Sequence, residues 1–133
     1  MQVKAITPRG YCKGVVRAIE MAKKAKDEKK PIVILGMIVH NQYIVDALKE
    51  MGIETIDHPG KTRLELLDEI DEGTVIITAH GASDQVFEKA RGKGLHVIDA
   101  SCLDVIKTHN VIKTRLQEGF EVLYFGKAGH PEA

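Results

Sequence analysis

The sequence predicts an α/β fold in which a parallel sheet carries helices on both faces. Short apolar runs alternate with segments whose apolar residues recur at helical spacing, and this order favours a parallel sheet with right-handed crossovers. Five reactive side chains each follow one of the apolar runs, namely Cys12, His40, His80, Cys102 and His130. Because ligands bind at the carboxyl ends of the strands in open α/β sheets, these side chains are expected to share one pocket.

Each predicted element has its own local signal. The predicted strands are short apolar runs over residues 2–6, 32–36, 53–56, 74–78, 96–99 and 120–125. The predicted helices cover about 15–28, 42–51, 63–70, 84–91 and 103–118. In the first helix the apolar positions 15, 18, 19, 22 and 25 have the spacing of one buried face. Asn41 is a suitable N-cap for the second helix and Gly52 a suitable stop.

Composition restricts the classes of protein that the chain can belong to. It has 133 residues, enough for one domain or for one domain and a piece of another. Lys and Arg together number 19, as do Asp and Glu, and this neutral balance argues against nucleic-acid binding. No signal peptide is recognisable, and no apolar run approaches the roughly 20 residues that span a membrane. A cytoplasmic protein without a membrane partner is therefore expected.

The last predicted strand bears on domain organisation. Residues 120–125 are followed only by a short segment rich in glycine, GKAGHPEA, and not by a crossover helix. A parallel strand in that position lacks the helical layer that should cover it. We therefore expect residues 1–99 to form a first α/β domain and residues 100–133 to be the beginning of a second, similar domain that is truncated.

The two cysteines have matching local settings. Cys12 lies between Gly10 and Gly14 just before a predicted helix, and Cys102 also stands between a strand and a helix. A helix N-terminus favours the thiolate, which is the form that binds metals. In a reducing compartment, two cysteines indicate metal binding or catalysis more readily than a disulfide. Two thiolates are nevertheless fewer than the three or four that iron–sulfur clusters usually require.

The histidines divide into two groups. His40 and His80 each stand where a strand gives way to a loop before a helix, which is a favourable position for binding phosphate oxygens. His130 is followed by Pro131 and Glu132, and a histidine near a carboxylate can relay protons. The remaining three histidines, His58, His96 and His109, are assigned no chemistry, and His109 is expected to lie in the core.

Five motifs occur together in a fixed order: RGYCKGVVRAIE, LGMIVHN, TAHG, DASCLDV and GKAGHPE. With them the chain resembles the 4-hydroxy-3-methylbut-2-enyl diphosphate reductase family of the methylerythritol phosphate route to isoprenoids. The resemblance covers the whole chain but only about the first half of the family's length. It implies an iron–sulfur oxidoreductase in which three similar α/β domains surround a central 4Fe–4S cluster.

The resemblance also implies roles for individual residues. Cys12 and Cys102 match two of the three cysteines that hold the cluster, and the third would lie beyond residue 133. His40, His80 and His130 match the histidines that bind the diphosphate substrate, and Glu132 matches the acid that delivers protons to the departing hydroxyl.

The implied reaction is a reductive dehydroxylation that gives isopentenyl and dimethylallyl diphosphates. The implied electron donor is ferredoxin or flavodoxin. By itself, the 133-residue chain is expected to be inactive and to lack the cluster.

The chain departs from the family pattern next to both cysteines, at Lys13, Ser101 and Leu103. None of these three departures changes a ligand, although the absence of the family's usual proline at position 103 would loosen the expected helix start. Two other classes of protein stay open. One is a zinc-dependent phosphoesterase that uses the same histidines, although no HExxH motif is present. The other is a non-catalytic phosphate-binding α/β module, in which the cysteines would have no role.

Overall fold

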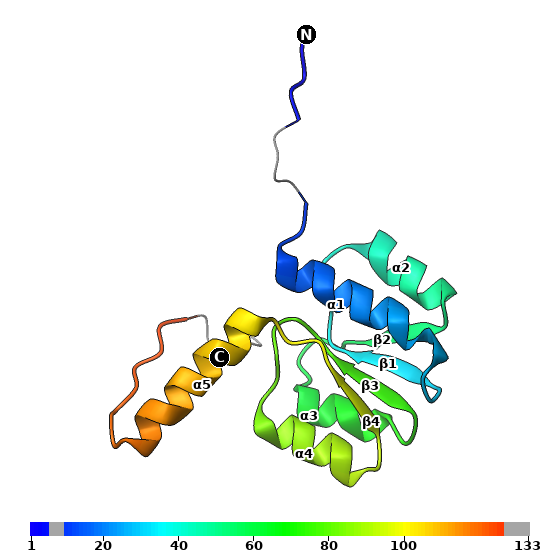
Figure 1. Cartoon of the computed structure of the whole chain (residues 1–133). Coiled ribbons are helices and arrows are strands. Elements are labelled where there is room, and N and C mark those ends of the chain that lie inside the picture. Colours follow the sequence, from blue (N-terminus) through cyan, green and yellow to red (C-terminus); the bar gives the residue numbers. More distant parts are fainter. Residues whose placement is uncertain (6–9, 127–133) are drawn as a thin grey trace.

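The computed structural model describes residues 1–5 and 10–126 (Figure 1). Its centre is a sheet of four parallel strands: β1 (Ile32–Leu35), β2 (Ile53–Ile56), β3 (Thr74–Ile77) and β4 (His96–Asp99). The order across the sheet is β2-β1-β3-β4. The chain therefore runs outward from β1 to β2 and then returns to the other side of β1, so the strand order reverses between β1 and β3. Ligands of open α/β sheets bind at such a reversal point.

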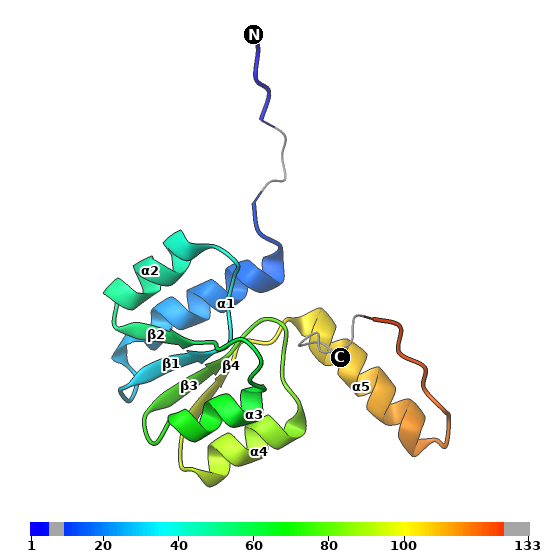
Figure 2. The same ribbon diagram turned by 180° about the vertical axis from the view of Figure 1, so that it is seen from behind.

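Helices cover both faces of the sheet, as predicted. The helices are α1 (Lys13–Lys24), α2 (Gln42–Glu50), α3 (Arg63–Leu66), α4 (Asp84–Gly92) and α5 (Leu103–Gln117), with short 3-10 turns η1 (Ala25–Asp27) and η2 (Leu67–Glu69). Figures 1 and 2 show α1 and α2 on one side of the sheet and α3 and α4 on the other. The fold class is thus confirmed, and so are four of the predicted strands.

Two apolar clusters, one on each face, stabilise this arrangement. Ile32 and Ile34 pack with α1, while Val33 and Leu35 point to the opposite face and pack near α3 and α4. All four residues of β1 are buried, as are all four of β3. Strands buried on both faces have nearly continuous apolar sequences. These two strands could therefore be recognised although apolar and polar residues do not alternate along them. The carboxyl edge of the sheet is therefore a rigid base for the loops that follow.

The strands predicted over residues 2–6 and 120–125 are wrong for the residues that the structure describes. Residues 1–5 and 120–126 belong to no strand. The N-terminal segment extends away from the sheet (Figure 1), and the side chain of Val3 is 85% exposed. A β-prone run becomes a strand only where a neighbouring strand pairs with its backbone. In the described ranges neither segment has such a neighbour, so no described strand precedes Cys12.

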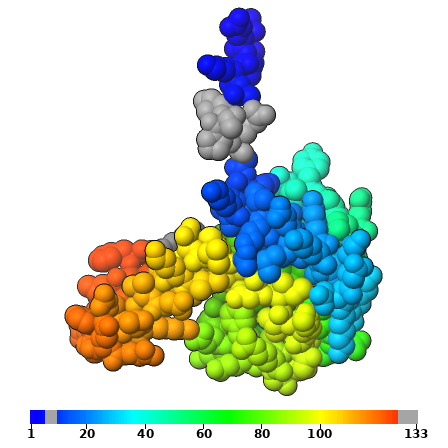
Figure 3. Space-filling model, in the orientation of Figure 1, coloured from blue at the N-terminus to red at the C-terminus, as the bar shows by residue number. Residues whose placement is uncertain are grey.

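Helix α5 projects from the body of the molecule. Figure 3 shows it with the following segment as a separate arm, and none of its residues is buried. His109 is half-buried, so its expected place in the core is wrong.

The boundary between residues 99 and 100 stays a prediction. In the part of the chain that the structure describes, no helix is long and apolar enough to cross a membrane.

Candidate functional site

Both cysteines line one cavity of about 330 Å³. Cys12 is the N-cap of α1 and Cys102 is the N-cap of α5, and neither side chain makes a capping hydrogen bond. Cys12 is exposed, Cys102 is half-buried, and both thiols are free. The full lining is Cys12, Gly14, Val15, Ala79, His80, Cys102, Asp104, Val105, Thr108, His109 and Tyr124. The fold therefore brings together two thiols that are distant in sequence.

Close backbone packing holds Cys102 in place. A Cβ atom added to Gly14 would lie 2.7 Å from Sγ and 3.0 Å from Cβ of Cys102. Arg17 on α1 donates a hydrogen bond from Nη1 to the carbonyl oxygen of Ser101 (2.9 Å). The amide of Cys102 itself donates to the carbonyl oxygen of Ala79 (2.8 Å). The thiol is thus fixed between the start of α1 and the end of β3.

A larger cavity of about 700 Å³ adjoins the cysteines' cavity, because His80 and His109 line both. Its charged and titratable lining residues are His40, Asp57, His58, Lys61, Arg63, His80 and His109. His40 is exposed on the loop after β1, and His80 is half-buried in the turn after β3. These two strands flank the reversal point of the sheet. His40 and His80 thus line one cavity, but His40 does not line the cysteines' cavity, so the expected single pocket is instead two adjoining cavities.

Two glycines shape the loops that carry these histidines. Gly36 follows β1 with a φ of 86°, a conformation that other residues adopt only with strain. Gly81 follows His80 with a φ of 74°, and its amide donates to the carbonyl oxygen of Thr78 (3.0 Å). A Cβ atom on Gly81 would lie 3.1 Å from Cγ1 of Val105. Glycine at this position therefore allows α5 to approach the turn of His80.

A hydrogen bond connects the loop of Cys12 to the loop of His40. Asn41 accepts from the amide of Tyr43 (3.1 Å) and so caps α2, as predicted. Its Nδ2 also donates to the hydroxyl of Tyr11 (2.7 Å). Sequence reasoning identified the cap but missed the link to Tyr11, because no local pattern relates these two positions.

Replacing Asn41 with alanine is expected to lower the free energy of unfolding by about 1 kcal/mol, the usual value of an N-cap. Urea denaturation of the chain would measure it. Asn110→Ala is the matched control, since Asn110 is exposed on α5 and makes no side-chain hydrogen bond to another described residue. Equal stability of the two variants would show that the cap of α2 contributes nothing.

Arg63 is the other residue that sequence reasoning missed. It begins α3, is half-buried, and donates from Nη2 to the hydroxyl of Thr78 (2.8 Å). Burial lowers the pKa of its guanidinium, and Asp57 opposes that shift with a smaller effect. A single arginine in a segment rich in acidic residues and leucine gives no sequence signal of burial. His58 and His96, to which the sequence assigned no chemistry, are both exposed and lie 3.2 Å from Glu69 and 3.4 Å from Glu28, respectively.

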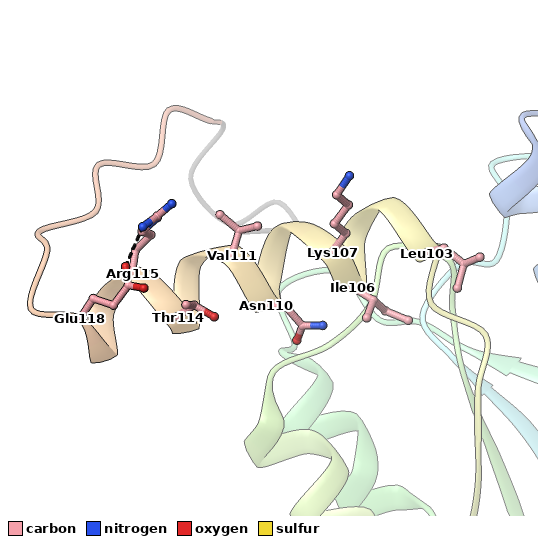
Figure 4. Close-up of a pocket in the computed structure, with 8 residues that line it drawn as sticks. All are labelled: Leu103, Ile106, Lys107, Asn110, Val111, Thr114, Arg115 and Glu118. Atoms are coloured by element: carbon pink, nitrogen blue, oxygen red, sulfur yellow. Dashed lines mark hydrogen bonds and ion pairs between the residues drawn. The ribbon is translucent and has the colours of Figure 1, made fainter.

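Several expected features lie elsewhere or outside the described residues. His130 and Glu132 fall outside them. A third hollow, of about 390 Å³, follows one face of α5 and contains no cysteine or histidine (Figure 4). Over residues 1–5 and 10–126, no three His, Cys, Asp or Glu side chains are grouped as metal ligands. The described part of the chain therefore offers two thiols facing one cavity as candidate ligands.

The fold and the site place this chain in a class of α/β proteins. In it, two cysteines and two histidines line adjoining cavities at the carboxyl edge of a parallel sheet. Comparison with known families is more specific. The LytB protein family matches residues 3–133, and the chain belongs to that family.

Named relatives agree with this assignment. The 4-hydroxy-3-methylbut-2-enyl diphosphate reductase of Geobacillus sp. (strain WCH70) is 56% identical over 135 residues, which is 99% of this chain and 42% of that protein. The enzyme of the same name from Brevibacillus brevis is 54% identical over 99% of this chain and 43% of its own length. The chain thus spans less than half the length of these relatives.

Solved structures show the same fold. The E-1-hydroxy-2-methyl-but-2-enyl-4-diphosphate reductase of Plasmodium falciparum superposes with a TM-score of 0.80 at 33% identity, over 95% of this chain and 38% of that one. A second structure, of (E)-4-hydroxy-3-methyl-but-2-enyl diphosphate reductase, gives a TM-score of 0.77 at 35% identity, over 92% of this chain and 41% of that one.

Proposed function

We propose that this chain contributes the cysteine and histidine edge of a 4-hydroxy-3-methylbut-2-enyl diphosphate reductase. The observation that carries the proposal is the convergence of Cys12, Cys102 and His80 on one cavity. The substrate and the reaction in this proposal are taken from the names of the relatives. A phosphate-binding module would need the histidines but would give no reason for two thiols to face the same space.

The residues present fit part of an iron–sulfur site. Thiolates are the ligands that such clusters prefer, and Gly14 keeps the space beside Cys102 free of a side chain. We assign Cys12 and Cys102 as two ligands of a 4Fe–4S cluster and expect the third from outside this chain. When bound, the cluster would supply the electrons for the reduction and polarise the substrate hydroxyl. Thiolates also bind zinc, but the relatives named above are reductases and not phosphoesterases.

The histidines hold and orient the substrate in this proposal. His40 and His80 line the larger cavity and would donate hydrogen bonds to the diphosphate oxygens. His130 would support them, and Glu132 would deliver a proton to the departing hydroxyl, which leaves as water. Reduction breaks the carbon–oxygen bond, and two electrons and two protons balance the reaction. Ferredoxin or flavodoxin would provide the electrons.

A chimera tests the proposal. This chain would replace the matching segment of the Geobacillus reductase, and consumption of 4-hydroxy-3-methylbut-2-enyl diphosphate would be measured under anaerobic conditions with a chemical reductant. We expect turnover to isopentenyl and dimethylallyl diphosphates. A chimera that folds and contains iron but does not reduce the substrate would contradict the proposal.

The 133-residue chain alone is expected to show no turnover in the same assay, because a third cluster ligand is not available from it. Iron analysis after anaerobic reconstitution should find no stable 4Fe–4S cluster. Measurable reduction by the purified chain would show that the reaction needs no further part of the relatives' sequence.

A further inference from the structure

Arg63 stands at the reversal point of the sheet, between the ends of two strands. Its Nη2 donates to Thr78, the residue that follows β3 (2.8 Å). On the other side, a Cβ atom added to Gly36 would lie only 3.4 Å from Nε of Arg63, so the guanidinium packs closely on the residue that follows β1. The loops of His40 and His80 begin at these two contacts. Arg63 therefore touches the base of both histidine loops.

The charge of Arg63 has no direct carboxylate partner, although the exposed Asp57 acts on it with a small electrostatic effect. Nη1 is buried and has no hydrogen-bond partner, and no carboxylate of the described residues forms a salt bridge with this side chain. Burial lowers the pKa of the guanidinium, but arginine still remains protonated at neutral pH. A buried charge without a partner destabilises a folded protein. Its position at the edge of a large cavity points to an anion that arrives from outside.

The other charged groups on this cavity differ from Arg63. Lys61 is exposed and bonded to Glu69 (2.6 Å), which raises the pKa of Lys61. The same carboxylate lies 3.2 Å from His58. Asp57 is exposed to solvent, where its charge is screened. Arg63 is therefore a permanent cation on this cavity that forms no salt bridge with a carboxylate of the described residues, and Asp57 opposes its charge only weakly.

We propose that Arg63 is a positioning residue for anion binding. It fixes the strand ends from which the loops of His40 and His80 leave, and its charge attracts a diphosphate to the cavity they line. It acts through its field and through those loops, because Nη1 is closed off from solvent. The inference rests on the proposed function, since that function supplies the diphosphate.

Isothermal titration of the 133-residue chain with inorganic pyrophosphate would test the proposal. The titration is run at about pH 8, where ordinary imidazoles are neutral. Arg63→Gln removes the positive charge but keeps an N–H donor for Thr78. Arg63→Lys keeps the positive charge but replaces the planar guanidinium with an ammonium group. Lys61→Gln is the matched control, because it removes a cation from the same cavity that already has a partner.

Pyrophosphate affinity should fall about tenfold or more in Arg63→Gln and stay within about threefold of the parent in Arg63→Lys and Lys61→Gln. Circular dichroism confirms that each variant is folded, and Arg63→Lys decides the question if Arg63→Gln does not fold. Full affinity in Arg63→Gln, or equal losses in the Gln and Lys variants, would overturn the role of the charge. A parent chain that does not bind pyrophosphate would overturn both this inference and the proposed diphosphate site.

Discussion

Replacing Cys102 with serine in the chimera is expected to remove the iron–sulfur cluster and nearly all reductase activity. Serine keeps the size of the side chain but loses the soft thiolate, so the fold should persist while the ligand is lost. Mutating a residue that only hydrogen-bonds to a metal ligand typically lowers metal affinity or activity roughly 10–100-fold. Loss of a ligand itself should therefore lower them at least as much. Iron content and substrate turnover, measured on the same preparation, give the result.

The control for this experiment is His96→Asn. His96 is exposed on β4, lies 3.4 Å from Glu28, and lines neither of the two cavities. That variant should keep both iron and activity. If Cys102→Ser instead retains a full complement of iron and turns over substrate like the parent, Cys102 is not a ligand, and the phosphate-binding module becomes the better interpretation.

Replacing Gly14 with alanine is expected to lower the free energy of unfolding of the chain by about 1–3 kcal/mol, the usual cost of overpacking. The new methyl group would lie 2.7 Å from Sγ and 3.0 Å from Cβ of Cys102, so α1 or the loop of Cys102 must move. Since both elements carry a cysteine, the same change should also reduce iron binding in the chimera. Urea denaturation measures the first effect and iron analysis the second.

Gly92→Ala is the matched control, since Gly92 is also helical and a Cβ atom there would meet no atom within 4 Å. Alanine favours a helix over glycine by roughly 0.5–1 kcal/mol, so this variant should be as stable as the parent or more stable. Adding Cys102→Ala to the Gly14→Ala chain removes the nearer of the two clashing atoms and should recover part of the loss. Additive losses in the double variant would mean that Gly14 and Cys102 do not interact.

The sequence predicted the buried strands well and the unpaired ones badly, for a physical reason. Residues 32–35 and 74–77 form strands whose two faces are both covered. Their nearly continuous apolar sequence predicts such burial. Residues 120–125 are also mostly apolar, whereas residues 2–5 mix apolar and polar side chains. Neither segment is a strand, because pairing depends on a neighbouring strand that no local pattern reveals. Phe125, for example, is 91% exposed.

The candidate site also contains some features that local sequence predicted and others that it did not. His40 and His80 could be placed from their positions after strands, because parallel strands end at one edge of a sheet. The contact of Gly14 with Cys102, the bond of Tyr11 to Asn41 and the burial of Arg63 join distant parts of the chain. Such contacts result from packing between elements, so they became visible only in the folded structure.

The convergence of the two thiols is the central claim, and chemical cross-linking tests it most directly. The chain contains only two cysteines, so a short bifunctional thiol reagent at low protein concentration reports on their proximity without ambiguity. Intact-mass spectrometry of the native chain should show one reagent bridging Cys12 and Cys102, and the bridge should be lost when the chain is first unfolded in urea. Two separate single-ended adducts on the native chain would contradict the shared cavity and the metal site built on it.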